Sequence, residues 1–158
     1  MSSKVKDTSL ASQGSLKIEY AERQMGALLK VRERFAKEKP FAGITIGMAL
    51  HVTKETAVLV RTLRAGGATV AIAGCNPLST QDDVAAALVS EGVAVFAQKG
   101  MTSNEYYENL RSVVEILKES LKPKENLKSA TAVGGVPSEG GKIKNHKSII
   151  TIDDGCDL

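Results

Sequence analysis

Short apolar runs, separated from one another by single helix-like stretches, are the feature that most limits how this chain can fold. Three of them cover residues 44–50, 69–73 and 93–97, and a fourth follows at 148–152. Continuous apolar runs of this length are typical of strands that are buried on both faces. Strands joined by single helices need crossover connections, so the sequence predicts an α/β fold, an open parallel sheet flanked by helices.

Apolar residues at helical spacing predict the elements that connect and precede these strands. The predicted helices cover residues 16–37, 53–65, 79–91 and 103–121. Ser15 is expected to cap the first helix, and Ser79 to cap the third with Asp82 as its partner three residues later. Residues 1–14 are expected to form a flexible segment, and residues 15–158 one partial domain.

Composition argues against several classes of function. The net charge is only +3, Trp is absent, and no cluster of aromatic and basic residues stands out, so a nucleic-acid partner is not expected. No leader-like apolar run opens the chain and no window is long enough to span a membrane, so no membrane partner is expected either. Two cysteines do not make a disulfide framework, and a cytoplasmic location is therefore expected.

Polar side chains follow the predicted strands at the point where each strand ends. His51 follows the first strand, Asn76 the second, Gln98 the third and Asp154 the fourth. Because ligands of open parallel sheets bind beyond the carboxyl ends of the strands, these residues are candidates for one polar small-molecule site. Imidazole exchanges protons near neutral pH, which makes His51 the first candidate for acid–base chemistry.

Each of these residues also has a purely structural interpretation. A histidine at the end of a strand can serve only as a hydrogen-bonding residue, and Thr53 and Ser79 can be helix caps. Asp154 precedes a glycine and can belong to a turn. Cys75 is expected to be a small buried residue rather than a nucleophile.

The motifs themselves resemble a known family. Residues 50–88, LHVTKETAVLVRTLRAGGATVAIAGCNPLSTQDDVAAAL, are similar to S-adenosylhomocysteine hydrolase, or adenosylhomocysteinase, with its LH, T-x-E-T-A and STQD motifs. The upstream EKPFAG, the later VAVFAQKG and the closing IDDGCDL also fit the pattern of the family. The resemblance extends from about residue 9 to residue 158, apart from a Lys- and Gly-rich insertion at about 118–147.

The resemblance implies a partial, Rossmann-like substrate domain for adenosine and homocysteine. In the family, NAD oxidises the ribose 3′-hydroxyl, homocysteine is eliminated, water adds, and the ketone is reduced again. By resemblance, His51 and Asp154 are the catalytic pair, Thr53 and Glu55 contact adenine, and Asp157 supports Asp154. Asn76 and Ser79 are expected to shape the homocysteine end of the site.

The chain departs from the family in ways that shape the functional prediction. Cys156 stands where the family has glycine, and no G-x-G-x-x-G motif for NAD is present. The family's enzymes are more than twice as long and commonly form homotetramers. The sequence therefore predicts an N-terminal fragment of an adenosylhomocysteinase that lacks the NAD-binding domain and is inactive alone. A stand-alone nucleoside-binding or regulatory module is the alternative, and an adenosyl or an inosyl substrate fits the motifs equally.

Overall fold

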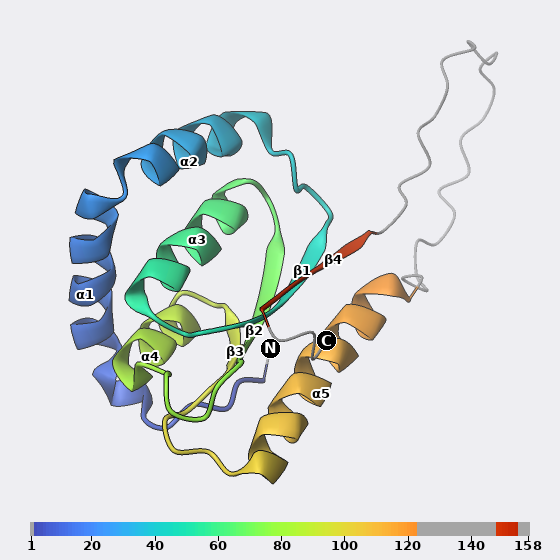
Figure 1. Cartoon of the computed structure of the whole chain (residues 1–158). Helices are drawn as coiled ribbons and strands as arrows, with labels where there is room; N and C mark the ends of the chain where they lie inside the picture. Colours follow the sequence, from blue (N-terminus) through green and yellow to red (C-terminus); the bar gives the residue numbers. More distant parts are fainter. Residues whose placement is uncertain (1, 123–147, 155–158) are drawn as a thin grey trace, which may run out of the picture.

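The computed structural model of the chain, which describes residues 2–122 and 148–154, is built around a four-stranded sheet (Figure 1). The strands are β1 (Thr45–Leu50), β2 (Thr69–Gly74), β3 (Ala94–Phe96) and β4 (Ile149–Asp153). They lie in the order β3-β2-β1-β4, and every neighbouring pair is parallel. The predicted fold class is confirmed, and each strand lies within one residue of its predicted ends.

Helices cover both faces of this sheet. A 3₁₀ turn at Thr8–Leu10 precedes α1 (Ala11–Gln24), α2 (Gly26–Glu38), α3 (Lys54–Ala65), α4 (Asp82–Ser90) and α5 (Ser103–Leu121). In Figure 1, α3 and α4 lie on one side of the sheet with α1 and α2 outside them, and α5 lies on the other side. Within the described residues, none of these helices is both long and apolar enough to cross a membrane.

The two faces of the sheet carry cores of different depth. The face under α3 and α4 buries large side chains such as Ile46, Met48 and Ile72. The face under α5 presents mainly alanine and glycine, and a Cβ atom added at Gly47 would lie 2.6 Å from the Leu117 side chain of α5. Small strand residues therefore let α5 approach the sheet closely.

The prediction of a single N-terminal helix at 16–37 is wrong. The helix begins at Ala11 and is interrupted at Met25, whose backbone leaves the helical region at ψ 47°, before α2 starts at Gly26. Ser15 therefore lies inside α1 and does not cap it. The apolar periodicity continues through the break, but Gly26 has the weakest intrinsic preference for a helix after proline. The break lets α1 contact α4 while α2 contacts α3.

Part of the N-terminal segment that we expected to be flexible has a defined place along the sheet. The Lys4 backbone N–H donates to the carbonyl of Val95 at 2.8 Å, and the Ala97 N–H donates to the carbonyl of Lys4 at 3.0 Å. These two bonds give Lys4 a parallel bridge to Phe96 of β3. Lys4 thus pairs with the outer edge of β3, in contrast to the expectation for residues 1–14.

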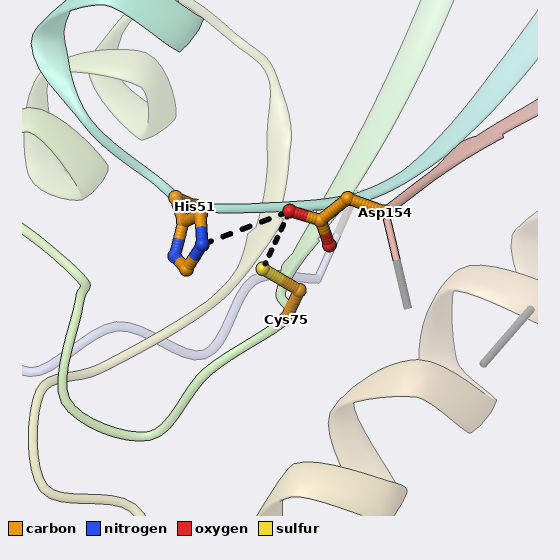
Figure 2. A group of neighbouring side chains, drawn as sticks. All are labelled: His51, Cys75 and Asp154. Carbon is orange, nitrogen blue, oxygen red and sulfur yellow. Dashed lines mark hydrogen bonds and ion pairs between the residues drawn. The ribbon is translucent and has the colours of Figure 1, made fainter. Parts of the chain in front are cut away.

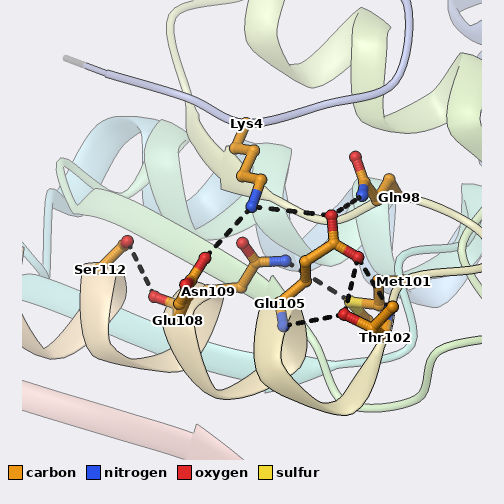
Figure 3. A network of polar contacts seen from close by, with 8 residues as sticks. All are labelled: Lys4, Gln98, Met101, Thr102, Glu105, Glu108, Asn109 and Ser112. Atoms are coloured by element: carbon orange, nitrogen blue, oxygen red, sulfur yellow. Dashed lines mark hydrogen bonds and ion pairs between the residues drawn. The ribbon is translucent and has the colours of Figure 1, made fainter.

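The beginning of α5 is held by a network of polar contacts (Figure 3). Thr102 and Glu105 form a reciprocal capping box, and the ammonium group of Lys4 lies 4.0 Å from the Glu105 carboxylate. The Gln98 amide donates to the same carboxylate at 3.1 Å. Gln98, a candidate for the ligand site, is thus engaged in fixing α5. The helix α5 continues to Leu121 and so includes the start of the insertion predicted at about 118–147. The rest of that insertion, residues 123–147, lies outside the described residues.

Candidate active site

The candidate site lies where the order of the strands reverses. From β1 the chain moves outward through β2 to β3. The connection that contains α5 then leads back to β4, which lies on the other side of β1. In open parallel sheets, ligands bind beyond the carboxyl ends of the strands at this kind of switch point. His51 follows β1 there, Cys75 follows β2, and Asp154 follows β4.

Backbone hydrogen bonds to the end of β1 hold the two neighbouring strand ends in place. The Cys75 N–H donates to the carbonyl of Leu50 at 3.2 Å, and the Asp154 N–H donates to the carbonyl of Ala49 at 3.4 Å. Cys75 and Asp154 are thereby fixed on opposite sides of β1. The residues of β1 that accept these bonds, Leu50 and Ala49, lie one and two positions before His51. The sheet ladder itself therefore brings together three side chains that are far apart in sequence.

The three side chains meet at the rim of the sheet (Figure 2). His51 Nε2 lies 3.7 Å from Asp154 Oδ2, and the Cys75 thiol donates to the same oxygen at 3.5 Å. The side chains of His51 and Asp154 are 49% and 44% exposed, so a ligand from solvent can reach them. The predicted pairing of His51 with Asp154 is therefore geometrically possible, because their facing atoms lie within ion-pair distance.

Ser79 holds the other side of the His51 ring. His51 Nδ1 and Ser79 Oγ are 2.6 Å apart, and Ser79 Oγ donates to the carbonyl of Asn76 at 3.4 Å. The expectation that Ser79 caps a helix is wrong, because α4 begins at Asp82 after Gln81, with no side-chain cap bond. Here the hydroxyl contacts both a local backbone carbonyl, that of Asn76, and the distant imidazole of His51.

This arrangement fits the tautomer of His51 that carries its proton on Nδ1. A serine hydroxyl has a single proton, and if that proton goes to the Asn76 carbonyl, Ser79 Oγ accepts from Nδ1–H. The neutral ring then carries its lone pair on Nε2, the nitrogen that faces Asp154. Such a histidine can accept a proton at Nε2 and return it, while the nearby carboxylate stabilises the protonated ring.

Thr53 and Glu55 occupy the first turn of the helix that follows His51. The Thr53 hydroxyl accepts a long bond, 3.5 Å, from the Thr56 N–H and so caps α3. The Glu55 carboxylate lies 3.1 Å from the ammonium group of Lys54, with 52% of its side chain exposed. Burial by itself raises the pKa of Glu55, but a backbone N–H and Lys54 outweigh it and lower the pKa below 4.5. Glu55 is therefore an acceptor-only group facing solvent.

Asn76 and Asp157 complete the predicted set of site residues. Asn76 Oδ1 accepts from the Leu78 N–H at 2.8 Å, so its side chain shapes the loop that carries Ser79. Asp157 lies outside the described residues, as does Cys156. The structure thus brings together His51, Ser79 and Asp154 directly, with Asn76 in the supporting loop.

Known proteins match the sequence of this chain. A sequence model of the family described as S-adenosyl-L-homocysteine hydrolase matches residues 2–151. The chain belongs to the S-adenosyl-L-homocysteine hydrolase family. It is 63% identical to an adenosylhomocysteinase of Saccharolobus solfataricus over 116 residues, which are 73% of this chain and 28% of that protein. It is 47% identical to an S-inosyl-L-homocysteine hydrolase of Methanocaldococcus jannaschii over 154 residues, 98% of this chain and 30% of that protein.

This member of the S-adenosyl-L-homocysteine hydrolase family therefore spans less than a third of the length of the curated relatives it matches. An S-inosyl-L-homocysteine hydrolase of Methanococcus maripaludis is 57% identical over 113 residues, 72% of this chain and 27% of that protein. Proteins of both names are therefore among the relatives of this chain. The segment that contains His51 is therefore related to a family of hydrolases.

Sequence reasoning missed the place of Cys75 in this family member. The residue was expected to be simply buried, but it is partly exposed at the rim and contacts Asp154. Burial, followed by the hydrogen bond and the negative charge of Asp154, raises the pKa of the Cys75 thiol to about 12. No local motif signals this contact, because it depends on the register of β4 against β1.

Gln81 is a second residue whose role local patterns did not reveal. Its side-chain oxygen accepts from the Lys54 N–H at 3.2 Å, and its backbone N–H donates to the Val52 carbonyl at 2.9 Å. These bonds connect the segment after His51 to the segment after Ser79. Gln81 thereby helps to hold the two loops of the site at a fixed distance.

Proposed function

We propose that this chain is the first part of the substrate domain of an enzyme that hydrolyses S-adenosyl-L-homocysteine or its inosyl analogue. The single observation that supports this most is the His51 ring, held by Ser79 on one side with Nε2 facing Asp154 on the other. The products are the nucleoside and homocysteine. The names of the related proteins include both the adenosyl and the inosyl hydrolase, so the purine base stays open in the proposal.

In this proposal His51 moves a proton at the 5′ side of the ribose. A neutral imidazole at Nε2 takes the proton of the water that adds, and in the protonated form gives a proton to the departing homocysteine sulfur. Asp154, at 3.7 Å, stabilises the protonated ring and shares the proton transfer. Ser79 keeps the ring oriented through Nδ1, at 2.6 Å.

The neighbouring residues serve recognition in the same proposal. Glu55, an exposed acceptor at the beginning of α3, would accept a hydrogen bond from the purine base, with Thr53 beside it. Asn76 would shape the homocysteine end through the loop that carries Ser79. Asp157, outside the described residues, is proposed to support Asp154.

The hydride chemistry of the family belongs to NAD, and we assign no residue of this chain to it. NAD, when bound to the complete enzyme, supplies oxidation and later reduction at the ribose 3′ position. No two glycines of the sequence are spaced as G-x-G, so the chain lacks the fingerprint that holds a dinucleotide. The isolated chain is accordingly proposed to be inactive. The complete enzyme is proposed to be a cytoplasmic homotetramer without a nucleic-acid or membrane partner.

Nucleoside binding to the isolated chain tests the recognition part of the proposal. We expect adenosine or inosine to bind with a Kd on the order of millimolar, since much of the site is contributed by other segments. In ¹H–¹⁵N spectra, shifts should be confined to residues 51–55, residues 75–81 and Asp154, with α2 (Gly26–Glu38) unaffected as an internal control. Glu55→Gln should weaken binding several-fold, whereas Glu38→Gln, the same change on α2, should not.

Two results of this titration would contradict the proposal. Shifts that avoid the rim would remove His51 and Glu55 from the ligand site. A sub-micromolar Kd would mean that the chain is already a complete binding site, and would favour the stand-alone nucleoside-binding or regulatory module instead.

A chimera tests the catalytic part. This chain would replace the corresponding portion of the Saccharolobus solfataricus adenosylhomocysteinase, to which it is 63% identical. With NAD present, homocysteine release should be measurable, and His51→Ala should lower kcat by about 100-fold or more. His146→Ala, the change at the other histidine of the chain, is the matched control and should leave kcat unchanged. A His51→Ala chimera with unaltered kcat would return His51 to a structural role.

A further inference from the structure

Three atoms suited to bind a transition metal converge at the rim of the sheet. The side chains of His51, Cys75 and Asp154 each offer one such atom, and these atoms all lie within 4.8 Å of one another. They come from the ends of three adjacent strands, and the backbone bonds to Ala49 and Leu50 fix two of them. In Figure 2 all three side chains point toward one shared space.

The spacing of these atoms is close to what a tetrahedral zinc ion requires. Zinc bonds of about 2.0–2.1 Å to nitrogen or oxygen and 2.3 Å to sulfur separate the ligand atoms by roughly 3.3–3.6 Å. The distances from Asp154 Oδ2 to His51 Nε2 and to Cys75 Sγ are 3.7 and 3.5 Å. The third pair, His51 and Cys75, has to close by no more than about 1.3 Å to reach the same geometry. Half-exposed side chains can rotate that far.

Ser79 prepares the histidine for such a role. A histidine that binds a metal through one nitrogen usually donates the proton on its other nitrogen to a neighbouring oxygen, which fixes the tautomer. Ser79 Oγ lies 2.6 Å from Nδ1, so Nε2 is left to face Asp154 and Cys75. The ring is thus already held in the orientation that a metal at this position needs.

We propose that His51, Cys75 and Asp154 form a binding site for a zinc ion, with a fourth coordination position open to solvent. Nitrogen, thiolate and carboxylate ligands together favour zinc over magnesium or calcium, which prefer oxygen alone. This assignment does not depend on the proposed hydrolase function, because it rests only on three ligand atoms and their support. Its consequence for that function is direct: an ion on Nε2 blocks the lone pair that would accept a proton.

The binding step has a defined proton balance. In the chain without metal the Cys75 thiol carries its proton and donates it to Asp154 Oδ2 at 3.5 Å. When zinc binds, the Sγ–H bond breaks, a Zn–S bond forms, and the proton leaves to the buffer. Zinc affinity should therefore rise with pH, and calorimetry in buffers of different protonation enthalpy should detect the released proton.

The experiment uses the 158-residue chain, purified free of metal and without nucleoside. Cobalt, which replaces zinc in such sites, should give the visible bands of a tetrahedral ion together with a thiolate charge-transfer band, and zinc should displace it. We expect a zinc Kd at or below the micromolar range. Cys75→Ser should abolish the thiolate band, and His51→Ala and Asp154→Asn should weaken binding by more than about 100-fold. As the positioning residue, Ser79 should matter less, with Ser79→Ala costing roughly 10- to 100-fold.

The chain offers a matched control for two of the ligands. It contains two cysteines and two histidines, so Cys156→Ser and His146→Ala make the same changes elsewhere and should leave zinc binding intact. Circular dichroism confirms that each variant is folded, and Asp154→Asn, which removes only a charge, tests the site if a larger change unfolds the chain.

The site would be refuted by cobalt spectra without a thiolate band, or by a band that persists in Cys75→Ser and disappears in Cys156→Ser. Equal zinc affinity of His51→Ala and wild type would also refute it. Since no nucleoside is present, these outcomes leave the nucleoside titration unaffected, and failure of that titration leaves the zinc result unaffected.

Discussion

Gly14 allows a close contact between α1 and α4, and replacing it should separate these two helices. A Cβ atom added at Gly14 of α1 would lie 1.9 Å from the carbonyl oxygen of Asp83 and 2.9 Å from the backbone nitrogen of Val84, both in α4. Real Cβ contacts are essentially never under 3.0 Å, so α1 would have to move about 1.1 Å away. The obstacle is backbone, which cannot rotate aside as a side chain can.

The magnitude follows from two opposing effects. Gly14→Ala gains roughly 0.5–1 kcal/mol in helix preference, but overpacking of a tight contact typically costs about 1–3 kcal/mol. Here a gap of about 1 Å also weakens the dispersion contacts of neighbouring side chains such as Ile18, by a quarter to a half. Because the lost dispersion contacts roughly offset the gain in helix preference, we expect the net loss to stay near the overpacking cost, about 1–3 kcal/mol in the free energy of unfolding.

Urea denaturation of the 158-residue chain, followed by circular dichroism, measures this difference. Gly26→Ala is the matched control, because Gly26 begins α2 and a Cβ added there meets nothing within 4 Å. That variant should be as stable as wild type or more stable, by up to about 1 kcal/mol. If Gly14→Ala were as stable as Gly26→Ala with an unchanged m-value, the close contact between α1 and α4 would not exist as described.

Two further predictions concern polar groups that are partly or fully buried. Burial by itself raises the pKa of Glu22, but hydrogen bonds from Arg32 and Arg61 outweigh it and lower the pKa below 4.5. The ionised Glu22 therefore stabilises the folded state above pH 4.5. This stabilisation is lost as the pH falls through the lower pKa of the folded state. Glu22→Gln should therefore be less stable than wild type at pH 7, by about 1.5–3 kcal/mol, and the difference should shrink below pH 4.5; a difference independent of pH would contradict this. The Thr80 hydroxyl is buried without a hydrogen-bond partner among the described residues, whereas Thr62 donates to a backbone carbonyl at 2.8 Å. Thr80→Val should thus be neutral or stabilising and Thr62→Val less favourable by about 1 kcal/mol, and equal effects in urea denaturation would mean that Thr80 has a partner.

The strands could be predicted because their apolar runs are continuous and their ends are marked by glycine or polar residues. The helix break at Met25 could not, since apolar residues recur at helical spacing on both sides of it. The bend has a tertiary consequence: α1 contacts both α4 and α3, while α2 contacts α3. Local spacing contains no information about these contacts.

The candidate site shows the same division. The sequence placed His51 and Asp154 at strand ends, and parallel pairing was enough to predict that they share a rim. The partner of Ser79 was assigned wrongly because a serine near a helix start fits a cap, while its actual partner, His51, lies 28 residues earlier. Cys75 and Asp154 are 79 residues apart, and only the register of β4 against β1 reveals their contact.

The geometry of His51 links the two proposals made for the site. A purely structural histidine would have both ring nitrogens satisfied and little exposure, but here Nδ1 is held at 2.6 Å by Ser79 while Nε2 faces a carboxylate at 3.7 Å in a side chain that is 49% exposed. The contact of Nδ1 with Ser79 orients the ring so that Nε2 can bind a proton or a metal ion. Nε2 has a single lone pair, so a proton and a zinc ion exclude each other. If both proposals hold, zinc must inhibit the chimeric hydrolase, and Cys75→Ser must relieve that inhibition while leaving His51 able to transfer its proton. Inhibition that is equally strong in Cys75→Ser would place the inhibitory metal elsewhere.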